Sequence, residues 1–220
     1  SEIAVLYRAH FHSMELQMEL TRGEIPFRIT SGIRFFEQAH IKDVVAFMRF
    51  VVNPKDELSF RRMVMLLPGI GPGMAQKLWI RWTACPESRQ ETPPESFSAL
   101  MLDFPVPAKS RTAWTQLCYT LDELAPAGKL AGPASMLLSI NEAVYDEYMQ
   151  AAFENYDQRR QDLLHLAGFS ERFESTEDFL SQLSLLGNTD DESAAADLSG
   201  GAVTLSTIHQ AKGLEWSVVF

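Results

Sequence analysis

The stretch that decides the fold is the last eighteen residues, Val203-Thr-Leu-Ser-Thr-Ile-His-Gln-Ala-Lys-Gly-Leu-Glu-Trp-Ser-Val-Val-Phe220. Residues 203–208 alternate apolar or β-branched side chains with hydroxyl side chains, and residues 218–220 are all apolar. Both patterns predict short β-strands. The residues between them include an imidazole, an ammonium and a carboxylate. We therefore expect a strand, a polar loop that carries the chemistry, and a second strand.

A further strand is predicted at the other end of the chain. Residues 3–7 are an apolar run without alternation, which is typical of a strand in a parallel sheet covered on both faces. Arg8 follows directly, and ligands of open α/β sheets bind at the carboxyl ends of strands. A guanidinium suits phosphoryl oxygens because it stays charged and presents a fixed fork of donors. Taken alone, the pattern equally allows Tyr7 to be a core residue and Arg8 a surface residue.

The two ends of the chain together resemble the UvrD/Rep/PcrA-type superfamily 1 DNA helicases. Residues 203–220 match that family's fifth motif, apolar-T-x-H-x-A-K-G-L-E-aromatic, and residues 4–8 resemble its fourth motif. In these helicases both motifs belong to one RecA-like (P-loop NTPase) domain, into which a helical subdomain is inserted. The resemblance implies a mainly α fold with a small α/β part, a helical insertion bracketed by the strands of an incomplete RecA-like domain. The expected parts are residues 1–33 and 202–220 in the RecA-like domain, residues 34–186 in the inserted subdomain, and residues 187–201 in a flexible linker.

The resemblance also implies a nucleotide site. Tyr7 would pack against the adenine of ATP, and Arg8 would reach the γ-phosphate as the catalytic residue of this set. Gly213 and Glu215 would lie near the ribose, whose hydroxyl groups suit a carboxylate because it is purely an acceptor.

DNA contacts are implied in the same loop. Thr207 and His209 would face single-stranded DNA, and Lys212 would help to connect the DNA with the nucleotide. Lys and His side chains suit phosphates because they donate hydrogen bonds. The alternative for Lys212 is a local ion pair with Glu215 on a surface loop.

A second candidate DNA site is Leu-Pro-Gly-Ile-Gly-Pro-Gly-Met-Ala at residues 67–75, between two amphipathic segments. This is the pattern of a helix-hairpin-helix, whose glycines let the backbone approach a phosphate next to a helix start. Lys77 and Arg81, four residues apart, would extend the contact. The alternative is a tight turn between helices. In the resembling family the equivalent Gly-Ile-Gly touches duplex DNA, so the predicted contacts are Gly69, Ile70, Gly71 and Lys77.

Helical periodicity fills most of the remaining chain. Asp56 is predicted to cap a helix whose Leu58, Met63, Val64 and Leu67 face a core. Gly168 is expected to end a helix, and the pair at positions 122 and 123 is expected to lie at a solvated helix end. Helices are predicted at residues 13–21, 41–52, 74–82, 109–124, 136–149, 155–167 and 175–186, and a strand at residues 26–30.

The charge distribution decides whether nucleic acid is a plausible partner. The net charge of −10 argues against it, because phosphate binding needs clustered Lys and Arg. Residues 28–81, however, hold nine basic and four acidic side chains, whereas residues 140–200 hold three basic and fourteen acidic ones. The predicted partners are therefore DNA at the basic segment and, at the acidic one, a possible repair protein. Solvated helix faces are the alternative for both segments.

Several further classes of site and location are excluded by the sequence. No apolar run is long enough to span a bilayer, and no basic-then-apolar leader opens the chain, so we expect a cytoplasmic protein without membrane contact. Cys85 and Cys118 lack metal-ligand spacing and are expected to be reduced thiols. His10 and His12 have no further ligand beside them, so no metal site is predicted.

ATP hydrolysis in such motors needs a phosphate-binding loop with Gly-Lys-Ser/Thr, an acidic pair for magnesium and a second arginine. None of these occurs here. By the resemblance, the first two lie before Ser1 and the third lies beyond Phe220. We therefore expect no ATPase or helicase activity and no tightly bound cofactor in this chain alone, and ATP with Mg²⁺ in a parent helicase that unwinds DNA at single-strand/duplex junctions together with its remaining domains.

Two alternatives to this interpretation stay open. One is a non-catalytic module that binds DNA or a protein partner through the hairpin at Gly69, Ile70 and Gly71 and through the helices of the acidic segment. The other is the helicase part of a helicase-nuclease. Sequence beyond Phe220 separates them, because a nuclease needs an Asp/Glu/Lys cluster there and a motor needs an arginine-bearing motif.

Overall fold

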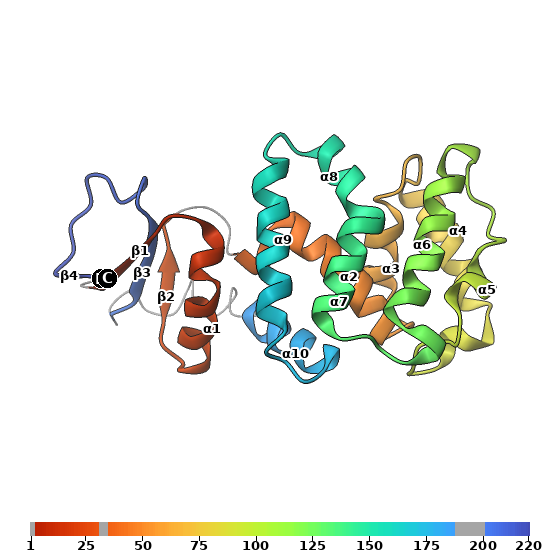
Figure 1. The fold of residues 1–220 in the computed structure, drawn as a ribbon, viewed down its shortest axis with the longest axis horizontal. Helices are drawn as coiled ribbons and strands as arrows, with labels where there is room; N and C mark the ends of the chain where they lie inside the picture. The colour runs from red at the N-terminus through yellow and green to blue at the C-terminus, as the bar shows by residue number, and fades with distance from the viewer. Residues whose placement is uncertain (1–2, 31–34, 188–200) are drawn as a thin grey trace. The chain divides into compact units, whose positions relative to one another are not determined.

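The computed structural model describes residues 3–30, 35–187 and 201–220 (Figure 1). The chain divides into two compact units: a sheet unit, residues 1–41 and 181–220, and a helical unit, residues 42–180. The division falls inside α2 (Ala39–Val52) and α10 (Thr176–Gly187), whereas the boundaries expected from sequence were at residues 34 and 186. Most of the expected linker, residues 188–200, lies outside the described residues. The fold is mainly α with one small parallel sheet, which confirms the predicted fold class.

Residues from both ends of the chain form the sheet. Its strands are β1 (Ile3–Tyr7), β2 (Phe27–Ile29), β3 (Val203–Thr207) and β4 (Val218–Val219), in the order β2-β3-β1-β4. All neighbouring pairs are parallel. The strands predicted from alternation and apolar runs are thus all present. β3 from the end of the chain lies between β1 and β2 from its beginning, so the two terminal motifs share one sheet.

The helix α1 (Met14–Arg22) connects β1 to β2 (Figure 1). It follows a 3₁₀ turn at His10–Ser13 and ends at Gly23, as predicted. Leu20 of α1 packs with Tyr7 and Leu205 in a small core. Coverage of the sheet on both faces was predicted but is wrong for its outer part, because Ile3, Val218 and Val219 are 40%, 43% and 50% exposed. β4 is the last strand of the order, so among the described residues no further strand lies at its outer edge.

Helices make up the helical unit. An aromatic cluster in its core joins Phe50 of α2 to Phe60, Trp82 and Phe97, with ring centroids 5.2–5.9 Å apart. α6 packs against α5 and α7. Its Trp114 Nε1 donates to the Met101 carbonyl at 2.9 Å. The helices are α3 (Glu57–Val64), α4 (Pro72–Thr83), α5 (Phe97–Met101), α6 (Arg111–Leu124), α7 (Pro133–Ile140), α8 (Asp146–Ala152) and α9 (Tyr156–Ser170), with 3₁₀ turns at Phe35–Glu37 (sheet unit), Pro86–Arg89, Ala108–Ser110 and Pro126–Gly128.

Some local predictions are confirmed and others are wrong. Asp56 caps α3, since its carboxylate accepts from Ser59 N at 3.0 Å. Leu58 is 80% exposed rather than in the core. The buried stripe of α3 begins at Phe60 and repeats at three and four residues, which leaves Leu58 on the opposite side. Gly168 does not end α9, which runs on to Ser170 because Phe169 is buried there.

Two further differences concern the middle of the helical unit. The helix predicted at residues 136–149 is interrupted by a π-helical turn, Asn141–Tyr145, between α7 and α8. Asp122 was expected at a solvated helix end, but its carboxylate accepts from the backbone N–H groups of Phe97 and Ser98 and from the Ser96 hydroxyl. Asp122 therefore holds the start of α5. Within the described parts of the chain, no helix combines the length and apolar character that a membrane crossing requires.

One buried carboxylate connects three elements of the helical unit. Asp43 on α2 accepts from Arg62 Nε at 2.7 Å and from the Tyr145 hydroxyl at 2.7 Å. Burial, followed by the negative charge of Asp43, raises the pKa of Tyr145 far above its ordinary value. The hydroxyl is therefore protonated and donates to Asp43 across the working pH range. The network fixes α2 and α3 against the π-helical turn.

Candidate functional site

The first candidate site is the carboxyl edge of the sheet, where β1 and β3 end side by side. Tyr7 and Thr207 are paired in the register of these parallel strands. The backbone N–H of Ile208 donates to the Tyr7 carbonyl at 3.0 Å, so the pairing continues one residue past β3. Arg8 is therefore placed beside the beginning of the loop that follows Thr207.

The loop at residues 208–217 starts at this edge and is shaped by backbone hydrogen bonds. The Thr207 carbonyl accepts from Gln210 N at 3.1 Å and from Ala211 N at 3.0 Å. Gly213 has φ +86°, a left-handed conformation that favours glycine, and a Cβ there would meet nothing within 4 Å. β3 and β4 flank β1 and run parallel to it, so the loop returns from the carboxyl end of β1 to its amino end, where Phe220 N donates to the Ala4 carbonyl at 2.9 Å.

Tyr7 and Arg8, adjacent in sequence, have opposite environments. Tyr7 is 6% exposed and packs with Leu20 and Leu205. Arg8 is exposed, and among the described residues its guanidinium has neither a hydrogen bond nor an ion pair. The alternation of a strand explains the difference, since successive side chains point to opposite sides. Arg8 is thus a free cation at the end of a parallel strand, a position suited to an anionic ligand.

The predicted functional side chains of the loop all face solvent. His209, Lys212 and Glu215 are exposed. The structure shows no ion pair between Lys212 and Glu215, so the local pairing considered as an alternative is not found in the described residues. The loop therefore presents two donors and one acceptor to solvent, as binding to phosphates and to sugar hydroxyls requires.

His12, near this edge, makes local contacts. Ala9 N donates to His12 Nδ1 at 3.2 Å, and the His12 ring lies 4.1 Å from that of Phe11. The side chain of His10 lies outside the described residues. Across the residues that the structure describes, no three His, Cys, Asp or Glu side chains form a cluster that suits a metal ion.

The second candidate site is the predicted hairpin in the helical unit, which forms between α3 and α4. Ile70 is 4% exposed and anchors the turn in the core. The Ser110 hydroxyl donates to the Pro68 carbonyl at 2.6 Å, which ties the turn to the 3₁₀ turn before α6. Gly71 is the N-cap of α4, and its carbonyl accepts from Ala75 N at 2.9 Å. A Cβ at Gly71 or at Gly73 would meet nothing within 4 Å, so the backbone at the start of α4 is open to a ligand.

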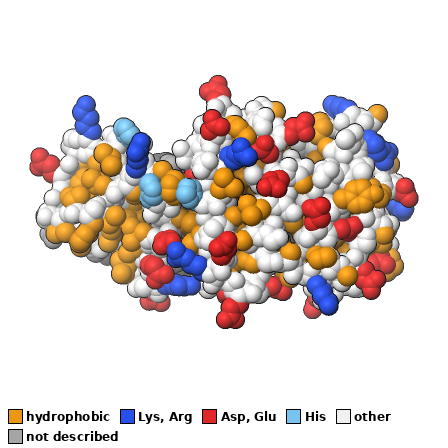
Figure 2. Space-filling view, viewed as in Figure 1, with side chains coloured by type: hydrophobic (Ala, Val, Ile, Leu, Met, Phe, Trp, Pro, Cys, Tyr) orange, Lys and Arg blue, Asp and Glu red, His pale blue; other side chains and the backbone are white. Residues whose placement is uncertain are grey.

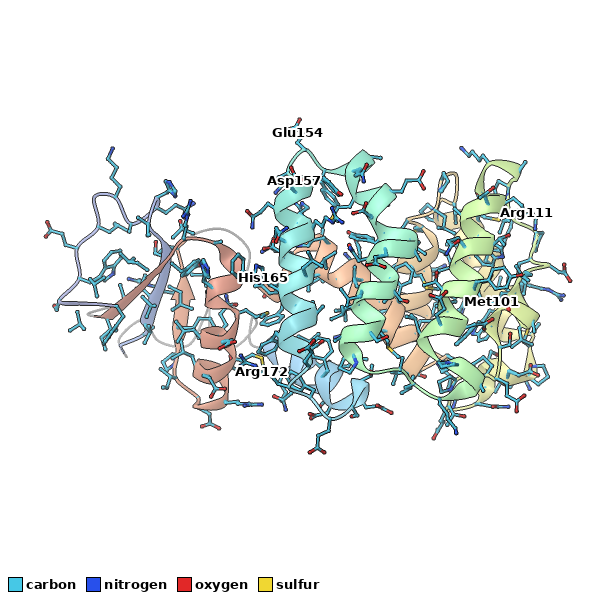
Figure 3. The ribbon with its side chains drawn as sticks, in the orientation of Figure 1. Met101, Arg111, Glu154, Asp157, His165 and Arg172 are labelled. Carbon is cyan, nitrogen blue, oxygen red and sulfur yellow. The ribbon has the colours of Figure 1, made fainter. Side chains whose placement is uncertain are left out.

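Cationic side chains lie on the elements that follow this hairpin. Lys77 and Arg81 are exposed on α4, and Arg81 lies over the Phe104 ring at 5.8 Å. Figure 2 shows Lys and Arg side chains, interspersed with Asp and Glu side chains, at the end of the helical unit formed by α4, α5 and α6. Arg111, labelled in Figure 3, reaches the Phe104 carbonyl through Nη1 at 3.4 Å. The sequence reasoning missed Arg111 and also Lys109, because it placed Lys109 inside α6 rather than in the turn before it.

The predicted residues thus form two groups, one in each unit. Strand register brings Tyr7, Arg8 and Thr207 together, and the loop carries His209, Lys212, Gly213 and Glu215 onward from them. The hairpin brings together Gly69, Ile70, Gly71 and, on the following helix, Lys77.

Comparison with known proteins gives consistent matches over this chain. The family model of UvrD-like helicase C-terminal domains matches residues 1–104 and 137–220. ATP-dependent DNA helicase PcrA of Bacillus subtilis is 30% identical over 232 residues, covering 100% of this chain and 31% of the relative. DNA helicase II of Escherichia coli is 29% identical with the same coverage, and a probable DNA helicase II homolog of Rickettsia conorii is 29% identical over 99% of this chain and 33% of its own length. The chain spans about a third of the length of these relatives.

Proposed function

Because this chain belongs to the family of UvrD-like helicase C-terminal domains, we propose that it is one part of an ATP-dependent DNA helicase. The curated relatives are named as DNA helicases. In this proposal the sheet unit supplies one side of the ATP site, and both units contact DNA. The observation that carries it is the exposed Arg8, which has no ion pair among the described residues, at the strand edge where β1 and β3 end together.

The residues present suit the nucleotide. Arg8 offers an unpaired guanidinium to the γ-phosphate, where it stabilises charge on the transferring phosphoryl group. Gly213 leaves open space beside the backbone, and Glu215 offers acceptors to the ribose hydroxyls. The buried Tyr7 fixes the strand end that carries Arg8, and its contact with adenine stays a prediction. Bound ATP would supply the phosphoryl group, and Mg²⁺ would supply the metal charge. The sequence of this chain contains no phosphate-binding loop.

The DNA contacts follow from the same loop and from the hairpin. Thr207, His209 and Lys212 lie on or just after β3 and would contact the single strand. Lys212 lies next to Gly213 in the chain, so the proposed DNA and ribose contacts share one loop. Gly69, Ile70, Gly71 and Lys77 would contact the phosphates of the duplex at a single-strand/duplex junction.

ATP turnover by the isolated chain tests this proposal. We expect the 220-residue chain to bind a duplex with a single-stranded tail and to show no turnover, because the phosphate loop and the acidic magnesium pair must come from the remaining helicase domains. Turnover in proportion to the concentration of purified chain would contradict the proposed division of the active site. A repair protein would bind at the acidic segment, residues 140–200, and is expected not to restore turnover.

A further inference from the structure

The two glycines of the hairpin have different surroundings. At Gly69, φ is +82° and a Cβ would collide with Lys109, whose Cε, Cδ and Nζ atoms are its nearest neighbours. At Gly71, φ is −97° and a Cβ would meet nothing. The Lys109 side chain therefore lies against the backbone of Gly69, in the space that a side chain at this position would fill. We call this contact the glycine seat. Gly71, in contrast, faces open space.

Lys109 is held at this place from its own side as well. It lies in the 3₁₀ turn Ala108–Ser110, and the next residue, Ser110, is fully buried and donates to the Pro68 carbonyl beside Gly69. The side chain of Lys109 is exposed, and it has no ion pair among the described residues. Its side chain thus lies beside Gly69, and its backbone is held near the hairpin through the neighbouring Ser110.

A second group of exposed residues lies on α4, which begins directly after the hairpin. Gly73, Lys77 and Arg81 follow one another at four-residue spacing, which places them on one face of the helix. Gly73 leaves the first turn bare, where free backbone N–H groups and the positive end of the helix dipole favour an anion. Lys77 and Arg81 then add two cations along the helix.

We propose that Lys109 is a phosphate-binding residue of the hairpin, and that Gly69 is required there because a side chain at this position would displace Lys109. Lys109, the open backbone at Gly71 and Gly73, and Lys77 and Arg81 form one track for a nucleic-acid backbone. This inference rests on the proposed function, since it names further residues for the proposed DNA contact. The contacts are made to phosphates, so they carry no base preference.

The test is the salt dependence of DNA binding by the 220-residue chain. A labelled duplex with a single-stranded tail is titrated with wild type and with Lys109→Gln at several salt concentrations. Each phosphate neutralised on duplex DNA contributes about 0.9 to the slope of log K against log salt. We expect Lys109→Gln to lower that slope by about 0.9 and to weaken binding about five- to tenfold near 0.1 M salt. Lys109→Arg keeps the charge and should keep the slope.

Lys129→Gln is the matched control. It removes the same exposed charge just beyond the opposite end of α6, whose 14 residues span about 21 Å. We expect its slope to equal that of wild type. If Lys109→Gln and Lys129→Gln bind alike while wild type binds with a clear salt slope, Lys109 is not a phosphate contact and the inference is wrong. If wild type itself does not bind, the proposed DNA contact of the helical unit fails, and the inference fails with it.

A double mutant tests whether Gly69 acts through Lys109, and a Gly71 variant tests the open backbone separately. Gly69→Ala should displace Lys109 and lower the slope of log K against log salt as much as Lys109→Gln does. The double mutant that carries both substitutions should have the same slope as either single mutant. Gly71→Ala should weaken binding with little change in slope, because it obstructs the backbone without removing a charge. Thermal melts identify any loss of folding from the strained φ at Gly69. An additive slope change in the folded double mutant would overturn the seat assigned to Gly69.

Discussion

Tyr7 and Thr207 occupy paired positions on the parallel strands β1 and β3, although they come from opposite ends of the chain. Each is followed by residues that leave the sheet at the same edge: Arg8 after β1 and the loop at residues 208–217 after β3. The sheet therefore assembles one site from two distant segments. Neither segment has this arrangement without the other, because β1 is hydrogen-bonded to β3 along its length.

Lys212→Ala should affect binding and leave folding intact. The side chain is exposed and unpaired in the described structure, so the free energy of unfolding should change by less than about 0.5 kcal/mol. Affinity for single-stranded DNA should fall, and the slope of log K against log salt should fall by about 0.7. Fluorescence anisotropy with an oligonucleotide measures both. Gln210→Ala, an exposed neighbour in the same loop, is the control and should leave the slope unchanged.

Asp43→Ala should destabilise the helical unit strongly. The carboxylate is 5% exposed and accepts hydrogen bonds from Arg62 and Tyr145, so its removal leaves a buried hydroxyl without its partner. We expect a loss of about 2–4 kcal/mol in the free energy of unfolding, measured in urea. Tyr145→Phe removes the hydroxyl that donates to Asp43 and leaves the bond from Arg62 in place. It should therefore lower the free energy of unfolding by less, about 1–2 kcal/mol. Equal, negligible losses in both variants would mean that the network contributes nothing to stability.

Asp122→Ala and Glu123→Ala form a matched pair on α6. Asp122 caps the start of α5 through two backbone N–H groups, whereas the exposed Glu123 has one hydrogen bond to Ser139. The first substitution should cost about 1–2 kcal/mol of stability and the second less than about 0.5 kcal/mol. Urea melts of the two variants decide the matter, and equal losses would rule out a special role for Asp122.

Stability should decrease at alkaline pH because of Cys118. Burial raises the pKa of this thiol from 9.0 to about 12. Because the pKa of the thiol is higher in the folded state, its contribution to stability is fully present below the pKa of the unfolded state. This contribution is lost as the pH rises from about 9 towards 12, because the unfolded thiol ionises first. The free energy of unfolding should therefore fall above pH 9 by up to about 1.4 kcal/mol per pH unit. Cys118→Ala should reduce this slope, and Cys85→Ala, which removes the less buried thiol, should reduce it less.

The sequence predicts those features that depend on neighbours along the chain. The cap at Asp56, the end of α1 at Gly23 and all four strands follow from local patterns, and the structure confirms them. The position of Arg8 at a strand end is equally local, because it follows directly from the apolar run before it. The residues of the terminal motifs were identified by the resemblance, and their roles stay predictions.

What the sequence does not predict depends on contacts between distant segments. From the sequence, Asp122 looks solvated and Gly168 looks like a helix end. In the structure, the start of α5 lies against Asp122, and the residue after Gly168, Phe169, is buried. From the sequence, Lys109 looks like an ordinary residue at a helix start, whereas in the structure its side chain lies against Gly69. The contacts of Asp122 and Lys109 join residues whose spacing has no helical or strand period, so no periodic pattern reveals them.

The most direct measurement is DNA-stimulated ATP hydrolysis by the complete protein that carries this chain, with Arg8→Ala compared with Arg22→Ala. Arg22 is an exposed arginine of the same unit whose partner is the exposed Glu19. We predict that Arg8→Ala lowers kcat by about 10³-fold or more, as expected for an arginine that stabilises the transferring phosphoryl group, and that Arg22→Ala has no effect. Full turnover in Arg8→Ala would contradict the claim that this sheet edge forms part of the ATP site.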